Sequence, residues 1–137
     1  MSFVQAYIKN PSRSLMLVNK ASGTVIVNKE VLDLTAGLAV PATSSSTRET
    51  IIGVANQAIS AADALTQVPV IETFQNDLWI ADTTNNSNTA HNGQSMVLTN
   101  STTVNNTGTT SAVGVVEQVD TFGAASARKI LVRFNPF

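Results

Sequence analysis

Apolar residues in this chain come in short, β-branched runs separated by Gly, Asn, Ser or Thr, as in residues 68–74 and 129–134. Such runs, bounded by turn-forming residues, are typical of β-strands, and the 3.6-residue spacing of an amphipathic helix is nearly absent. One helical turn is expected at residues 60–65, with Ser60 as its N-cap. The sequence therefore predicts an all-β fold: a small β-barrel or sandwich of short, mostly antiparallel strands.

The expected strands lie about ten residues apart. They are residues 14–19, 24–28, 32–40, 50–58, 68–74, 78–82, 95–100, 113–119 and 129–134. We expect the first two to form a hairpin across residues 20–23. The Asn- and Thr-rich stretch 83–93 is expected to be a long polar loop.

Two of these strands resemble each other. Residues 52–58 and 113–119 both contain a Gly-Val pair, and in both a Gln follows three residues after the Val. Glycine inside a strand marks a bulge or the close approach of another backbone segment. We interpret the two copies as similar β-units that close one barrel.

Residues 1–30 lie outside this repeat and hold four of the eight basic residues. We expect them to form either an ordinary hairpin of the barrel or an N-terminal arm that docks on a neighbouring subunit. Residues 31–137 are expected to form the β-barrel domain. An arm would explain the apolar and aromatic residues close to the terminus. The candidate interface residues are Phe3, Val4, Tyr7, Ile8, Arg13 and Trp79.

Composition narrows the possible partners. Eight Lys and Arg stand against nine Asp and Glu, and charged residues make up 12% of the chain, about half the usual fraction of roughly 25%. A surface so poor in basic groups does not favour nucleic acid. No apolar run approaches the length of about 20 residues needed to span a membrane, and the N-terminus lacks the pattern of a signal peptide. We expect neither a nucleic-acid nor a membrane partner.

Motifs for reaction chemistry are weak. Cysteine is absent, and the single histidine, His91, has no Gly-x-Ser-x-Gly nucleophile elbow to act with. The calcium-loop pattern fails, because Ser87 and Gly93 stand where Gly and Glu are required. We therefore expect no catalytic residue, no metal, no cofactor and no enzymatic activity.

Two weaker alternatives remain open. Glu72, Asp77 and Asp82 are near one another in sequence and could supply carboxylates to a hydrolase. Trp79, with the polar stretch 83–93, could instead serve a glycan- or receptor-binding module of a phage fibre or bacterial surface. On strand alternation Trp79 lies opposite Leu78 and Ile80, so we expect a core or interface anchor.

Several strand motifs together resemble a known family. They are 51–54 (Ile-Ile-Gly-Val), 68–70 (Val-Pro-Val), 77–82 (Asp-Leu-Trp-Ile-Ala-Asp), 114–116 (Gly-Val-Val) and 130–134 (Ile-Leu-Val-Arg-Phe). In order and spacing, residues 32–134 are similar to the small β-barrel decoration, or cementing, proteins of tailed-bacteriophage heads.

This resemblance implies a structural virion protein on the outer surface of the capsid, synthesised in the host cytoplasm. It implies a homo-oligomer, with a trimer favoured, that binds the major capsid protein at subunit junctions and stabilises the assembled shell. Because such a protein binds only the assembled shell, its binding free energy stabilises that shell at every symmetry-related site.

Overall fold

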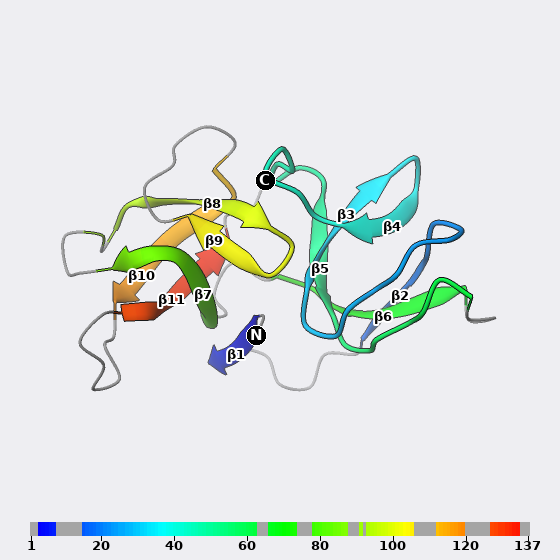
Figure 1. Ribbon diagram of the computed structural model, residues 1–137, viewed down its shortest axis with the longest axis horizontal. Helices are drawn as coiled ribbons and strands as arrows, with labels where there is room; N and C mark the ends of the chain where they lie inside the picture. The colour runs from blue at the N-terminus through cyan, green and yellow to red at the C-terminus, as the bar shows by residue number, and fades with distance from the viewer. Residues whose placement is uncertain are drawn as a thin grey trace.

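In a computed structural model the described residues are 3–7, 15–62, 66–73, 78–87, 91, 93–105, 112–119 and 127–134. None of them forms an α-helix, and they contain eleven β-strands in two sheets (Figure 1). The strands are β1 (Val4–Tyr7), β2 (Met16–Asn19), β3 (Val31–Thr35), β4 (Leu38–Pro41), β5 (Ile51–Ala55), β6 (Gln67–Ile71), β7 (Leu78–Ser87), β8 (Ser95–Asn100), β9 (Thr103–Asn105), β10 (Gly114–Val119) and β11 (Ala127–Phe134). The prediction of an all-β, mostly antiparallel barrel fold is confirmed.

The C-terminal unit, β7 to β11, is a closed five-stranded barrel. Its strand order is β7-β11-β10-β8-β9, and β9 returns to pair with β7. This closing pair is parallel, with Asp82 opposite Thr103 and Thr83 opposite Val104, whereas the other pairs are antiparallel. Strand β1 adds to the same edge of β7, ahead of β9, and extends the barrel to a six-stranded sheet.

The N-terminal unit, β2 to β6, repeats this plan. Its order is β2-β6-β5-β3-β4, all antiparallel, and a single parallel bridge between Lys20 and Ala39 links the end of β2 to β4. Each strand of one unit therefore has a counterpart in the other: β2 with β7, β3 with β8, β4 with β9, β5 with β10 and β6 with β11. The two units lie side by side in Figure 1.

The registers of the two units also agree. The matching pairs are Met16↔Val70, Val54↔Ile71 and Ala55↔Val70 in the N-terminal unit, and Trp79↔Val132, Val115↔Arg133 and Val116↔Val132 in the C-terminal unit. The same correspondence aligns the Lys20–Ala39 bridge with the Thr83–Val104 pair. The chain is thus two copies of one five-stranded plan.

This arrangement changes the interpretation of the sequence repeat. Its copies were expected to close one barrel together, but 52–58 runs along β5 in the N-terminal unit and 113–119 along β10 in the C-terminal unit. Each copy has its own set of neighbouring strands. The repeat in sequence therefore marks two five-stranded units rather than two halves of one barrel.

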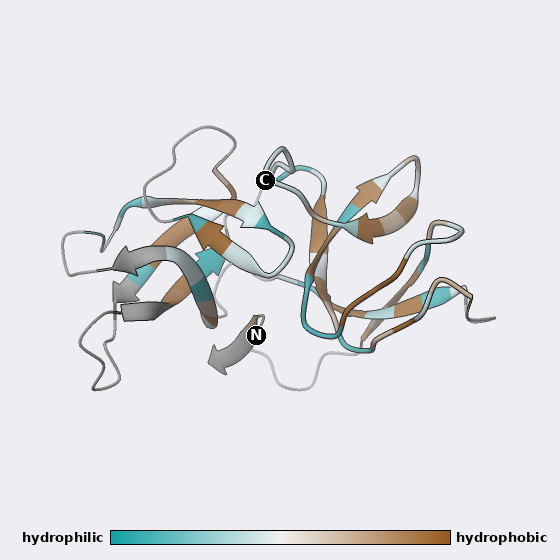
Figure 2. Cartoon of the chain, viewed as in Figure 1, coloured by the Kyte–Doolittle hydropathy of each residue, from teal (hydrophilic) through white to brown (hydrophobic). Residues whose placement is uncertain are grey.

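Buried apolar side chains lie in both units and at the junction between them. Figure 2 shows the hydrophobic stretches along the strands of both units. One buried cluster lies within the N-terminal unit and includes Leu32, Ala55 and Val68. The other fills the C-terminal barrel and continues onto Val31 and Val54 of the N-terminal unit. Because one cluster spans both units, their packing is continuous.

Polar contacts also join the two units. Val31 N–H donates to the carbonyl of Ser101 at 2.7 Å, and Ser101 Oγ–H donates to Glu30 Oε2 at 2.7 Å. The second oxygen of this buried carboxylate accepts from Val27 N–H at 2.7 Å. Near the N-terminus, Phe3 N–H donates to Lys29 O at 3.0 Å.

The N-terminal thirty residues are divided between the two units. Strand β2 belongs to the N-terminal unit, where it pairs with β6, and not in a hairpin with residues 24–28 as expected. Ile26 instead bridges to Ile59. Strand β1 pairs with β7 of the other unit, so the expected boundary after residue 30 falls inside the N-terminal unit.

Two further expectations change. The stretch 83–93 was expected to be a loop, but β7 continues through Ser87, because Thr83 is buried and this half of the strand pairs with β9 and β11. Of the expected helical turn, Ala61 and Ala62 form a turn. Residues 63–65 lie outside the described residues.

Candidate functional site

Phe3 and Trp79, two of the expected interface residues, are core residues. Both are fully buried, and both rings pack on Phe134, with centroid distances of 5.5 Å and 6.3 Å. Neither is exposed for contact with another protein, and Trp79 offers no open platform for a sugar. Of the two roles expected for Trp79, a core or an interface anchor, the structure shows the core. The glycan-binding alternative loses the ring on which it was based.

The other expected interface residues are less informative. Val4 and Tyr7 lie on β1, where their backbones pair with Ile80 and Leu78. Ile8 and Arg13 lie outside the described residues. The structure therefore places β1 against β7 of its own chain.

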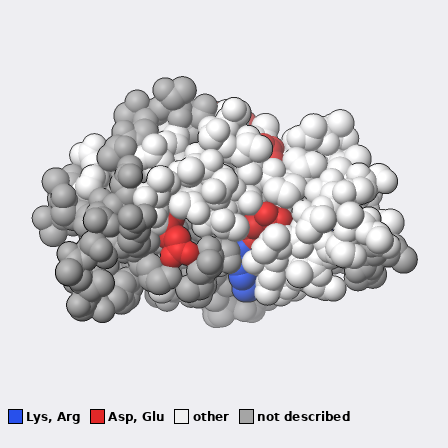
Figure 3. Space-filling view, in the orientation of Figure 1, with Lys and Arg blue, Asp and Glu red and all other residues white. Residues whose placement is uncertain are grey.

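The large apolar side chains that are exposed among the described residues all belong to the N-terminal unit. They are Leu15, Leu17, Val25, Val27, Leu34 and Leu38. In Figure 3 the charged atoms on this side lie near the middle of the view, and the described residues at the right are without charge. Exposed apolar surface with few charges is typical of protein contact sites, where ionised groups are costly to desolvate.

The end of the N-terminal unit where β2 and β5 begin and β3 and β6 end contains a hollow of about 430 Å³. We call it the open end. Its lining includes Met16, Leu34, Ile52 and Glu72. The corresponding positions of the C-terminal barrel hold Trp79, Leu98, Val113 and Phe134, all buried. One copy of the fold is therefore packed at this end, and the other is hollow.

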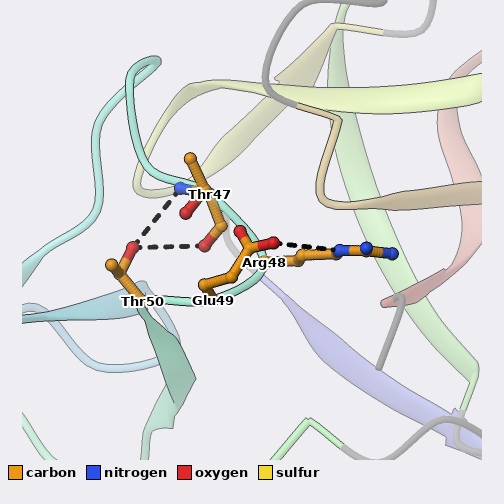
Figure 4. A network of polar contacts seen from close by, with 4 residues as sticks. All are labelled: Thr47, Arg48, Glu49 and Thr50. Atoms are coloured by element: carbon orange, nitrogen blue, oxygen red, sulfur yellow. Dashed lines mark hydrogen bonds and ion pairs between the residues drawn. The ribbon is translucent and has the colours of Figure 1, made fainter. Parts of the chain in front are cut away.

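A short polar network forms part of the rim of the open end (Figure 4). Thr50 Oγ1 donates to Thr47 O at 3.2 Å, and Arg48 Nε lies 3.3 Å from Glu49 Oε1. A hydrogen bond from the Thr47 side chain, aided by the Glu49 backbone and by Arg48, lowers the pKa of the exposed Glu49 carboxyl. Glu49 and Glu72 both line the open end, which therefore combines apolar walls with acidic groups.

Strand β2 borders the open end and has an edge that no described strand covers at Leu17. Lys20 N–H donates to Thr66 O at 2.7 Å. In an antiparallel ladder the bonded pairs alternate, so residues 18 and 16 also bond to β6, and the N–H and C=O of Leu17 face the other way. Opposite Leu17 on β6 stands Pro69, whose carbonyl faces away from β2 and accepts from Asn56 N–H at 2.9 Å.

Groups that could support reaction chemistry are dispersed. Glu72 lines the open end, whereas Asp82 lies on β7 opposite Lys129, and Asp77 lies outside the described residues. Within the described ranges, no three His, Cys, Asp or Glu side chains are grouped as metal ligands. The described part of the chain contains no helix long and apolar enough to cross a membrane.

The chain was compared with protein-family models, with curated proteins and with solved structures. Nothing matches.

Sequence reasoning missed the exposed apolar residues, although one signal was present. Residues 15–18 read Leu-Met-Leu-Val, without the apolar-polar alternation of a strand that has one face in water. Such a run belongs on a strand covered on both faces. In this chain the inner face is covered, while Leu17 on the outer face is 61% exposed.

Proposed function

We propose that this protein is a non-enzymatic structural protein that attaches to a large protein assembly through the apolar surface of its N-terminal unit. One observation carries the proposal: among the described residues, large exposed apolar side chains are confined to one of two units that share the same strand plan. In the other unit, Leu98 and Ile80 occupy the positions of Leu34 and Leu17 and are more deeply covered. In this duplicated fold, the large apolar side chains of one unit are covered and those of the other are exposed. Such a molecule is suited to attach to a partner through one side.

The resemblance to phage head decoration proteins supplies the identity of the assembly. We propose that the chain binds the outer surface of an assembled capsid and cements neighbouring major capsid subunits, as a homo-oligomer. Low charge suits this role, because many modest contacts repeated over a shell give a large total stabilisation without charged hot spots.

Binding to empty, expanded head shells tests this proposal. The shells are assembled from the major capsid protein encoded in the same genome, mixed with the purified full-length protein and sedimented. We expect the wild-type protein to sediment with the shells at fixed stoichiometry and to raise the temperature at which they fall apart.

The matched variants are Leu17→Lys, on the apolar surface, and Ser22→Lys, at an exposed polar position of the same unit. Leu17→Lys should weaken shell binding, and Ser22→Lys should not. A wild-type protein that stays in the supernatant, with shells no more stable than before, would refute capsid cementing.

A further inference from the structure

The edge of β7 shows which strands can pair with the corresponding edge of β2. Strand β1 lies antiparallel along it, with Val4 opposite Ile80, Gln5 opposite Trp79 and Tyr7 opposite Leu78. Beyond this point the same edge of β7 pairs with β9. One edge therefore accommodates two strands in succession, β1 first and the closing strand second.

Strand β2 has the same two places. Its end is linked to β4 through the Lys20–Ala39 bridge, as β7 is paired with β9. Ahead of that bridge, residues 15–17 correspond to residues 78–80, which β1 covers on β7. Among the described strands none pairs with β2 there, and Leu15 and Leu17 are 47% and 61% exposed.

The two edges are chemically alike. Residues 15–17 read Leu-Met-Leu and residues 78–80 read Leu-Trp-Ile, so both present three apolar side chains in a row. The backbone groups of Leu17 face outwards, as the bonding of Lys20 to Thr66 requires. A strand that pairs with the edge of β7 would therefore find similar backbone groups and similar neighbouring side chains on the edge of β2.

We propose that the edge of β2 at residues 15–17 is a second binding site for a β1-like strand, called here the second seat, and that a different protein supplies this strand. The described residues contain two such edges and one β1. The β1 strands of an assembly of this chain could therefore fill only half of the seats, even if β1 were exchanged between copies. The occupant is an extended, apolar segment of a partner protein, added antiparallel to β2 by strand augmentation as β1 is added to β7.

This inference rests on the proposed function only for the partner's identity, which would then be a capsid subunit with an extended arm. The seat itself can be tested without shells. The probe is a fluorescein-labelled peptide with the sequence of residues 2–10, which contains β1, and binding to the full-length protein is followed by fluorescence polarisation. A scrambled peptide is the control ligand.

Two variants localise the binding. Leu17→Pro removes an N–H that faces the open edge and leaves the ladder to β6 intact, and edge strands tolerate proline. Val25→Lys alters a side chain of similar exposure, 54%, that lies outside β2. We expect wild type and Val25→Lys to bind alike, and Leu17→Pro to bind roughly tenfold or more weakly, a loss of about 1.4 kcal/mol. If Leu17→Pro does not fold, Leu17→Lys replaces it, since charge on an edge also blocks strand addition.

The outcomes separate the two proposals. The second seat is overturned if wild type does not bind the peptide. It is also overturned if Leu17→Pro and Leu17→Lys leave peptide binding unchanged, which would mean that the peptide displaces β1 from β7. If wild type binds the peptide but not the shells, the second seat stands and capsid cementing is refuted. If the protein binds shells and substitutions at Leu17 do not weaken this binding, capsid cementing stands, but it does not occur through the second seat.

Discussion

Gly53 and Gly114 occupy the same place in the two units. A Cβ atom at Gly53 would lie 2.3 Å from the carbonyl oxygen of Ile71, and a Cβ atom at Gly114 would lie 2.3 Å from that of Arg133. Both carbonyls belong to the strand that follows in sequence and pairs with the glycine-bearing strand. The Gly-Val repeat in the sequence therefore has a physical cause: in each unit a neighbouring backbone fills the space of a side chain.

Alanine at either glycine should destabilise the protein. Gly114→Ala is expected to lower the free energy of unfolding by about 2–3 kcal/mol through overpacking. Gly53→Ala should cost more, because its φ of +153° also disfavours a side chain. The control is Gly23→Ala, where φ is +73° but no atom lies within 4 Å, and where the conformational cost alone is about 1–2 kcal/mol. Urea unfolding measures all three, and a loss at Gly114 below that at Gly23 would contradict the close approach.

The duplication supplies a matched pair of leucines. Leu98 is buried in the C-terminal barrel, whereas its counterpart Leu34 lines the open end and is exposed. Leu98→Ala should cost about 3 kcal/mol, within the range for large-to-small core substitutions. Leu34→Ala should change stability by less than about 1 kcal/mol. Thermal unfolding of the two variants checks the contrast, and equal losses would mean that the open end is packed.

The carboxylate of Glu30 joins the two units. It accepts hydrogen bonds from Val27 N–H and Ser101 Oγ–H, both at 2.7 Å. Glu30→Ala removes both bonds and leaves Val27 N–H without this acceptor, so it should cost about 3 kcal/mol, whereas Ser101→Ala should cost about 1 kcal/mol. Denaturant unfolding measures the difference. Glu30→Ala with wild-type stability would show that this contact does not hold the units together.

Glu49 offers a test in pH. The Thr47 side chain is the largest cause of its lowered pKa. Because the folded pKa lies below the unfolded one, the ionised group favours folding above the unfolded pKa, and this contribution is lost as the pH falls through the folded pKa. Thr47→Val should raise the pKa of Glu49 towards its ordinary value. A carbon-detected NMR titration measures it, and an unchanged pKa would exclude the Thr47 hydrogen bond as the cause.

The sequence predicted the type of fold because its strongest local signals, β-branched runs and turn residues, are those of strands. It also revealed the repeat through Gly53 and Gly114, whose spacing to the following Gln is retained. It did not show that each copy has a complete set of partners, because the corresponding strands β2 and β7 share almost no sequence. Strand order depends on pairing between distant segments, and no local pattern encodes that pairing.

The candidate site was predicted less well, for a related reason. Phe3 was expected at an interface because it is apolar and lies near the N-terminus, and Trp79 was expected to anchor either a core or an interface. The structure brings both against Phe134, which is distant in sequence. Leu17 was read as an ordinary strand residue, because its exposure follows from the absence of a covering strand among the described residues and not from its own chemistry.

Amide hydrogen exchange at Leu17 and Ile80 tests whether β2 has an open edge where β7 is paired with β1, since these residues hold equivalent positions and differ in whether β1 covers them. We predict rapid exchange at Leu17, protection at Ile80, and protection at Leu17 once the peptide of residues 2–10 is added. Slow exchange at Leu17 in the free protein, or no change on adding the peptide, would contradict this prediction.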